Sequence, residues 1–180
     1  TVLYHKADQV LALGTDSRGL FIYQPKNLKT FVYPAKEPSR TSAYYAQCIL
    51  DSNTILASNG LMIDIRTNTV KGNFPTHFNN YMLANDDHGN IYYAKGKQVY
   101  RYSLSEQLEY PIKSSAYIVA HSITRIANEI WLGTTAGIGY IRNDSMVWVY
   151  KTRLGVDNDG IKCIAADSKG DLWFGSYFQL

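Results

Sequence analysis

The side chains from which catalytic or metal sites are built do not stand in this chain at the spacings that such sites use. Asp86 and Asp87 have the residue types of paired carboxylates, but Asp86 also begins an Asp-x-x-Gly turn, which explains it better. Asp-Asn-Asp-Gly at 157–160 lacks the spaced carboxylates and distal Glu of a calcium loop. The sequence has neither a Gly-x-Ser-x-Gly motif nor a phosphate loop. None of the histidines has metal-ligand spacing: His5, His77, His88 and His121. We therefore predict no catalytic residue, no metal and no cofactor, and we expect His88 to be solvated in its turn.

The composition excludes several other classes of protein. With 180 residues, 46% of them hydrophobic and 18% charged, the chain is long and apolar enough for one globular domain. The net charge of +3 is spread along the chain, so no nucleic-acid contact is predicted. No apolar stretch approaches the ~18 residues of a membrane helix. Cys48 and Cys163 lie far apart, and two buried free thiols are favoured over the disulfide that an oxidising compartment would allow.

A repeat supplies the elements that must position any site. The segment Leu-Trp-Phe-Gly-Ser at 172–176 has four relatives, at 11–15, 54–58, 91–95 and 130–134. Their small residues stand at steps of 43, 37, 39 and 42: Gly14, Ala57, Ala94, Gly133 and Gly175. Such steps are typical of a four-stranded propeller blade, and the 15 tyrosines also favour strands.

Each copy has a short apolar strand before it and, where the chain continues, two strands after it, with turn residues between them. We therefore predict an all-β fold, a β-propeller fragment of about four four-stranded blades and half of a fifth, in a single domain over 1–180. The expected blades span about 1–33, 44–72, 80–112, 118–150 and, incomplete, 160–180. The alternative is a sandwich or meander with chance similarity between its segments. Trp131, Trp173 and Tyr92 are expected to fill the wedge between blades, while the small residues two positions on leave room for a neighbouring side chain.

The C-terminal copy resembles a known repeat. Residues 160–177, Gly-Ile-Lys-Cys-Ile-Ala-Ala-Asp-Ser-Lys-Gly-Asp-Leu-Trp-Phe-Gly-Ser-Tyr, are similar to the two-component regulator propeller repeat. The residues that stand in its characteristic places are Ile161, Ile164, Asp167, Gly170, Leu172, Trp173, Gly175 and Ser176. Residues 129–141 match the middle of the repeat. The earlier copies match more loosely, since Ala12 and Ile55 replace the tryptophan.

The resemblance implies a function. In that family about seven blades form each propeller, often two propellers stand in tandem, and they serve as extracytoplasmic sensors of membrane-anchored hybrid histidine kinases. It implies a non-catalytic, periplasmic sensor segment that senses an oligosaccharide and controls transcription through a phosphorelay. The chain is then expected to be part of a longer sensor. The edges of its last two strands would be covered by the remaining blades of the parent or, in a homodimer, by a second copy.

Ligand-binding residues are expected in the loops at one end of the propeller, which join the second strand to the third and one blade to the next. Aromatic faces stack on sugar rings, amide groups and Asp bind hydroxyls, and Arg and Lys suit an acidic or sulfated saccharide. The predicted ligand residues are Arg40, Tyr44, His77, Phe78, Lys95, Tyr117, Arg153, Asp157 and Tyr177. Two other functions stay open. A propeller-fold lyase or glycosidase would need converging carboxylates near the axis, and a scaffold propeller would bind protein partners.

Overall fold

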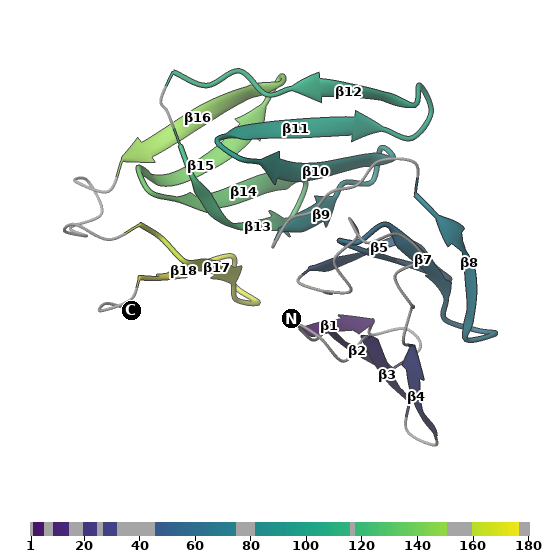
Figure 1. Cartoon of the computed structure of the whole chain (residues 1–180). Helices are drawn as coiled ribbons and strands as arrows, with labels where there is room; N and C mark the ends of the chain where they lie inside the picture. The colour runs from purple at the N-terminus through teal and green to yellow at the C-terminus, as the bar shows by residue number, and fades with distance from the viewer. Residues whose placement is uncertain are drawn as a thin grey trace. The chain divides into compact units, whose positions relative to one another are not determined.

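In the computed structural model, every regular element in the described residues is a β-strand (Figure 1). The described residues are 2–5, 9–14, 20–24, 27–31, 46–74, 82–115, 118–150 and 160–176. The chain forms two compact units, residues 1–81 and residues 82–180, and each is described by itself.

The first unit contains two four-stranded antiparallel sheets, each a simple meander in chain order. The first sheet consists of β1 (Val2–His5), β2 (Val10–Gly14), β3 (Leu20–Gln24) and β4 (Asn27–Phe31). The second consists of β5 (Gln47–Asp51), β6 (Thr54–Ala57), β7 (Leu61–Asp64) and β8 (Thr69–Asn73). The two sheets share one core, to which both contribute alternate residues of their middle strands: Val10, Ala12, Leu20, Ile22, Ile55, Ala57, Leu61 and Ile63.

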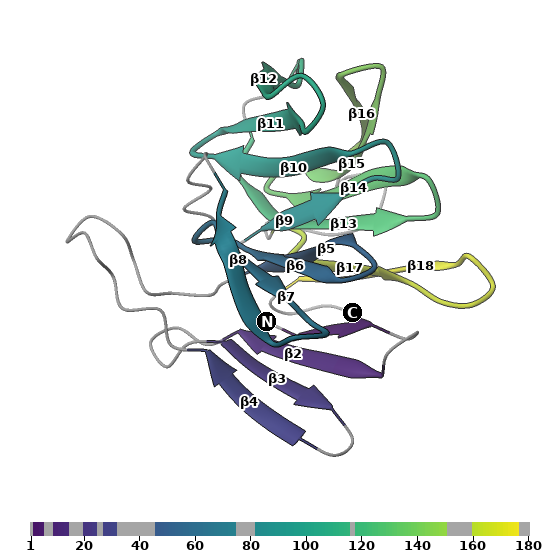
Figure 2. The ribbon, with the colours of Figure 1, turned by 90° about the vertical axis from the view of Figure 1, so that its right-hand side faces the viewer.

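The second unit contains two more four-stranded meanders and a hairpin. The third sheet consists of β9 (Leu83–Asn85), β10 (Asn90–Lys95), β11 (Gln98–Ser103) and β12 (Leu108–Pro111). The fourth consists of β13 (Ala120–Ile126), β14 (Glu129–Thr134), β15 (Gly137–Arg142) and β16 (Ser145–Tyr150). The hairpin consists of β17 (Cys163–Ala166) and β18 (Leu172–Gly175). The first strand of the fourth sheet, β13, lies between β9 and β17, and Figure 2 shows β9 beside β13.

This arrangement confirms the predicted fold class: four four-stranded blades of a β-propeller and half of a fifth. The first strand of each sheet lies at one edge of that sheet and beside the first strand of a neighbouring sheet. This arrangement is that of stacked blades and not of one continuous sheet. The pairs Gln24↔Asn27 and Leu20↔Phe31 place β4 at 27–31, because hairpin register rather than hydrophobicity sets the strand. The assignment of residues 1–180 to a single domain stays a prediction.

The Asp-x-x-Gly signature of the repeat forms a turn in which one carboxylate accepts hydrogen bonds from several backbone N–H groups. In the third blade, Asp86 Oδ1 accepts the backbone N–H groups of His88 at 2.8 Å and Asn90 at 2.9 Å. Oδ2 accepts the hydroxyl of Tyr92 at 3.1 Å, and Gly89 supplies the positive φ of 75°. This confirms that Asp86 has a structural role and that His88 is exposed in its turn.

The fifth blade repeats this turn at the same spacing. Asp167 Oδ1 accepts the backbone N–H groups of Lys169 at 2.8 Å and Asp171 at 3.0 Å, and Gly170 has a φ of 88°. The indole N–H of Trp173 donates to Asp167 Oδ2 at 3.3 Å, in the place of the Tyr92 hydroxyl. The aspartate and the aromatic residue six positions later are therefore one hydrogen-bonded unit of the repeat.

The wedge-filling role predicted for the aromatic residues holds for two of the three. Tyr92 is buried in the core between the third and fourth blades, and Trp131 packs on the cluster that joins the fourth and fifth. Trp173 is 57% exposed, which contradicts the prediction. The β17–β18 hairpin turns Ile164 and Phe174 towards the fourth blade, so Trp173 lies on its opposite face.

Small residues leave room for the neighbouring blade, as predicted, most clearly at Gly133. A Cβ built there would lie 2.5 Å from Ser122 Oγ and 2.7 Å from the backbone oxygen of Ile161, which leads into the fifth blade. A side chain at this position would therefore collide with the next blade.

Two ion pairs join the third blade to the fourth. Arg101 of β11 binds Asp144 in the β15–β16 turn through Nε–Oδ1 at 2.7 Å and Nη2–Oδ2 at 2.8 Å, and it lies over the Tyr110 ring. Arg125 of β13 binds Asp87 in the β9–β10 turn. Asp87 therefore serves packing between blades rather than forming a carboxylate pair with its neighbour.

The two cysteines are both free thiols, and they differ in exposure. Cys48 is buried and Cys163 is exposed, so the prediction of two buried thiols is wrong for Cys163. The reason is the same as for Trp173, because Cys163 shares the outward face of the hairpin. Burial raises the pKa of the Cys48 thiol far above its ordinary value.

Candidate ligand-binding site

The turns and strand ends on which ligand residues were predicted lie together at one end of the second unit. The β10–β11 turn lies at Gly96 and Lys97, and the β14–β15 turn lies at Thr135 and Ala136. The pair Ala120↔Thr134 brings the start of β13 to the β14–β15 turn, and the N–H of Ile161 donates to the Thr134 oxygen at 3.0 Å. The start of the fifth blade is therefore hydrogen-bonded to the same turn.

Most of the predicted ligand residues fall outside the described residues. These are Arg40, Tyr44, His77, Phe78, Tyr117, Arg153, Asp157 and Tyr177. The remaining one, Lys95, ends β10 at the expected end of the blade, and its Nζ lies 3.3 Å from Glu109 Oε2 and 5.3 Å from the Tyr100 ring centroid. Tyr93 also donates its hydroxyl hydrogen to Glu109. These contacts give Lys95 a structural role within the third blade, while its part in ligand binding stays a prediction.

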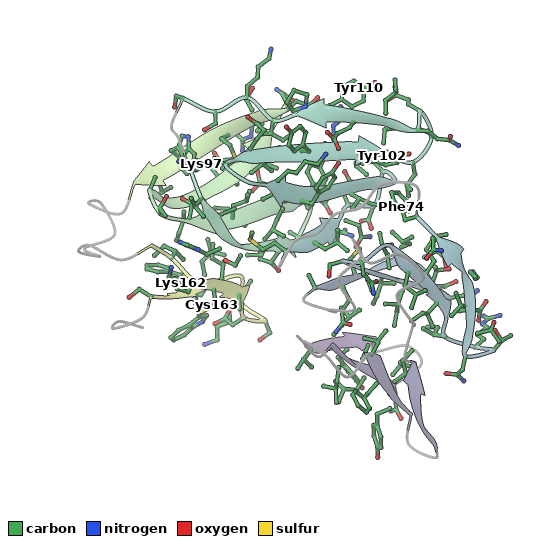
Figure 3. The ribbon with its side chains drawn as sticks, viewed as in Figure 1. Phe74, Lys97, Tyr102, Tyr110, Lys162 and Cys163 are labelled. Carbon is green, nitrogen blue, oxygen red and sulfur yellow. The ribbon has the colours of Figure 1, made fainter. Side chains whose placement is uncertain are left out.

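The sequence analysis missed a pair of nitrogen groups at this end, His121 and Lys162. Lys162 Nζ lies 3.0 Å from His121 Nε2, although the residues are 41 positions apart in the sequence. His121 belongs to β13 of the fourth blade, and Lys162 directly precedes β17 of the fifth. Figure 3 labels Lys162 beside Cys163 at the start of the hairpin. Both side chains are half-buried.

A β-bulge aims His121 at the fifth blade. In the pairing of β13 with β14, Ala120 faces Thr134 and Ser122 faces Gly133, so His121 is the extra residue. Such a residue leaves the regular alternation of the strand. No local sequence signal marks this bulge, which is why the histidine had no special status in the sequence.

Hydrogen bonds hold the turn beside this pair in place. The Thr134 hydroxyl donates to the Gly137 oxygen at 3.0 Å and accepts the N–H of Ala136 at 3.1 Å. Thr135 donates its N–H to the Val119 oxygen at 3.1 Å, and its hydroxyl accepts the N–H of Val119 at 3.3 Å. The turn is thus tied both to itself and to the strand that carries His121.

Gly160 is the third component of the arrangement, and its lack of a side chain is required. A Cβ at this buried position would lie 2.9 Å from the His121 ring and 2.9 Å from the Thr135 Cα. The backbone that leads to Lys162 therefore passes directly against the imidazole. Gly160 fixes the distance between the two blades at this point.

Burial, and secondarily the positive charge of Lys162, lowers the pKa of His121 below its ordinary value of 6.5. The imidazole is therefore neutral at pH 7, and a neutral Nε2 can accept a hydrogen bond from the Lys162 ammonium. This leaves the ring hydrogen on Nδ1. The pair therefore places the Lys162 ammonium beside a neutral imidazole.

The arrangement suits the binding of an anion rather than a metal. An ammonium and an imidazole together offer two nitrogen donors once the histidine is protonated, and both bind carboxylate or sulfate oxygens well. Among the described residues, no three His, Cys, Asp or Glu side chains gather as metal ligands. The same residues contain no helix long and apolar enough to cross a membrane.

The comparison with protein families agrees with the resemblance described above. Residues 155–178 match the family model named two component regulator propeller. This segment of the chain is therefore similar to a two-component regulator propeller repeat. Its matched segment includes the Asp167 turn, the β17–β18 hairpin and Lys162. No curated protein matches the chain in sequence.

Solved structures with the same fold include bacterial extracellular domains. One is described as the extracellular domain of the hybrid two component system BT4673 from B. thetaiotaomicron, with a TM-score of 0.69 and 18% identity over 98% of this chain. That of BT3049 from the same organism has a TM-score of 0.69 and 16% identity, also over 98% of this chain. This chain spans 25% of each. At such identities the similarity establishes the fold.

A propeller of a different description superposes equally well. The beta-propeller domain of Cps50 (Swd1) from Myceliophteria thermophila has a TM-score of 0.71 at 13% identity, covering 97% of this chain and 61% of that one. The same blade geometry therefore occurs in a protein that is not described as a two-component system, and the repeat match carries the more specific information.

Proposed function

We propose that this chain is a non-catalytic segment of the periplasmic sensor of a membrane-anchored hybrid two-component histidine kinase. In this proposal the sensor binds an oligosaccharide, and binding biases the kinase between two states and so controls transcription through a phosphorelay. The observation that carries the proposal is the two-component regulator propeller match at residues 155–178. The similarity in fold to extracellular domains of hybrid two-component systems supports it.

Two exposed apolar sheet faces support the proposal that further blades of a parent sensor pack against this chain. In the first blade, Val2, Tyr4 and Tyr23 are 65%, 55% and 47% exposed, and they share the face opposite to the core. In the fifth blade, Trp173 and Cys163 share such a face. Blades of a propeller normally bury both faces, so contiguous apolar surfaces of this kind fit neighbouring blades.

The full reading frame around this segment is the first test. We expect it to encode further repeats on at least one side, a membrane-spanning helix, a histidine kinase and a DNA-binding output domain. A reading frame without a kinase or a membrane helix would refute the sensor proposal.

A binding assay is the second test. Isothermal titration of the 180-residue chain against neutral, uronate-containing and sulfated oligosaccharides should give saturable binding for one class without product formation. Turnover of a glycan that a single Asp or Glu substitution abolishes would refute the non-catalytic assignment and favour the lyase or glycosidase alternative.

Light scattering at increasing protein concentration examines how the exposed faces are covered. We expect the chain to be monomeric at low concentration, since its natural neighbours in the proposal are blades of the same polypeptide. A stable dimer at all concentrations would refute this and favour the homodimer.

A further inference from the structure

The two junctions of the fourth blade are built differently. Between the third and fourth blades, an apolar core is flanked by two pairs of an arginine with a carboxylate. Between the fourth and fifth blades, the buried apolar cluster consists of Ile138, Ile161 and Ile164. The side-chain hydrogen bond across this second junction joins Lys162 Nζ to His121 Nε2 at 3.0 Å. A titratable base therefore stands where the other junction has ion pairs.

This contact requires a neutral imidazole. An ammonium group has hydrogens to donate and no lone pair, so His121 Nε2 must be the acceptor. Once Nε2 carries a hydrogen, it can no longer accept one from Lys162, whatever other contacts the ammonium makes. The ring also has little room to move, because a Cβ at Gly160 would lie 2.9 Å from both Cδ2 and Nε2. A protonated ring that turns towards this side must displace the backbone of the fifth blade.

From this geometry we propose that protonation of His121 loosens the packing of the fifth blade on the fourth, so that this junction is a pH-sensitive element of the fold. The step adds one proton to Nε2 and breaks the hydrogen bond to Lys162. The proposal goes beyond the proposed sensor function and does not depend on which ligand the chain binds.

The other titratable groups around His121 are bound elsewhere or face away from it. The strands packed against β13 are β9, β10, β14 and β17, and neither β9 nor the β14–β15 turn has a titratable side chain. Those of β10, β13 and β14 bind other residues: Tyr92 binds Asp86, Tyr93 and Lys95 bind Glu109, Arg125 binds Asp87, and Glu129 binds Arg142. Cys163 of β17 lies on the outward face of the hairpin. In the described part of the chain, Lys162 is the charged group that acts on His121.

The direction of the pH dependence follows from linkage. In the closed junction, burial and then the charge of Lys162 lower the pKa of His121 below its ordinary value of 6.5. When the junction opens, the imidazole is solvated and regains its ordinary pKa. Opening therefore takes up a proton below pH 6.5. The junction is most stable above this pH, and it is weakened as the pH falls from 6.5 through the lowered pKa of His121.

Two backbone hydrogen bonds report the two junctions separately. The N–H of Ile161 donates to the Thr134 oxygen across the junction of the fourth and fifth blades, at 3.0 Å. The N–H of Met146 in the fourth blade donates to the oxygen of Lys113, which follows the third blade, at 2.8 Å. Hydrogen exchange of each amide therefore measures how often its own junction opens.

The test is hydrogen exchange of the ¹⁵N-labelled 180-residue chain, followed by NMR at two pH values and corrected for the intrinsic exchange rates. Between about pH 7.5 and about pH 5.5, we expect the protection factor of Ile161 to fall by up to about tenfold, because the lower pH is about one unit below the ordinary histidine pKa. The protection factor of Met146 should stay within about twofold, because its junction has no histidine contact.

One variant and one control assign the effect to His121. His121→Gln keeps a side-chain oxygen that can accept from Lys162 and does not titrate, so the protection of Ile161 should become equal at the two pH values. His88→Gln removes an exposed imidazole from the β9–β10 turn, and the fall at Ile161 should persist in this control.

An NMR titration of the His121 ring in the unmodified chain keeps the proposal testable if His121→Gln does not fold. We expect its pKa to lie below 6.5. A pKa at or above that value would overturn the proposal, as would unchanged protection of Ile161 or an undiminished fall in His121→Gln. An equal fall at Met146 would show a loss of stability of the whole unit and would also overturn it. Each of these results leaves the sensor function intact.

Discussion

Substitution of Gly133 by alanine is the sharpest test of how the blades pack. The added Cβ would meet two atoms closer than 3.0 Å, the Ser122 hydroxyl oxygen and the Ile161 backbone oxygen. The hydroxyl can rotate away, whereas the backbone oxygen belongs to the segment whose N–H is bonded to Thr134. The fifth blade must therefore shift away from the fourth, or the strand must bend.

The expected cost follows from two opposing terms. Forcing one methyl group into a close-packed core typically costs about 1–3 kcal/mol, and contact with backbone places Gly133→Ala near the upper value. Alanine recovers roughly 0.5–1 kcal/mol by reducing the conformational entropy of the unfolded chain. The net loss in the free energy of unfolding is thus about 2 kcal/mol, or roughly 4–8 °C in Tm for a chain of this length.

Urea unfolding followed by tryptophan fluorescence measures this loss. All three tryptophans of the chain lie in residues 82–180, so the signal reports the unit that contains Gly133. Gly139→Ala is the matched control, because its Cβ would meet the Met146 Cε, the end of a flexible side chain, and the Trp148 ring at 3.3 Å. We expect Gly139→Ala to cost about 1 kcal/mol or less. Equal costs for the two variants would refute the packing argument.

Four further predictions concern other residues. Asp144→Ala should lower the free energy of unfolding by about 1 kcal/mol, because the ion pair is partly exposed to solvent. A double-mutant cycle with Arg101→Met should show that most of this loss is coupling energy between the two side chains. The hydrogen bond and charge of Arg101 lower the pKa of Asp144. The ion pair therefore contributes its stability above the ordinary aspartate pKa, and this contribution is lost as the pH falls through the lowered pKa of Asp144. Asp144→Asn should lessen that loss of stability at low pH. Asp86→Ala removes the acceptor of two backbone N–H groups and should cost about 1–2 kcal/mol by thermal unfolding, and no change in Tm would contradict the structural role of the turn. Iodoacetamide should label Cys163 in the native protein and Cys48 only after unfolding, as mass spectrometry of the peptides would report; native labelling of Cys48 would contradict its burial.

Local features of this chain could be predicted from the sequence because each depends on a few adjacent residues. The Asp86 and Asp167 turns close through bonds to residues two and four positions on, so the letters Asp-x-x-Gly suffice to specify them. The alternation of apolar residues at a recurring step of about forty residues similarly indicates four-stranded blades. Gly133 could be assigned to the wedge because small residues recur at that place in every copy.

Features that depend on two distant segments needed the tertiary structure. Trp173 is a residue type that is typical of a core, yet its exposure is set by which face of the hairpin packs against the fourth blade. His121 and Lys162 meet only because a bulge re-aims one strand and a glycine lets the next blade approach. The sequence by itself determined the blade, since turns and alternation act over neighbouring residues. The tertiary structure alone decided which side chains of adjacent blades face each other, since that depends on the approach of backbones far apart in the chain.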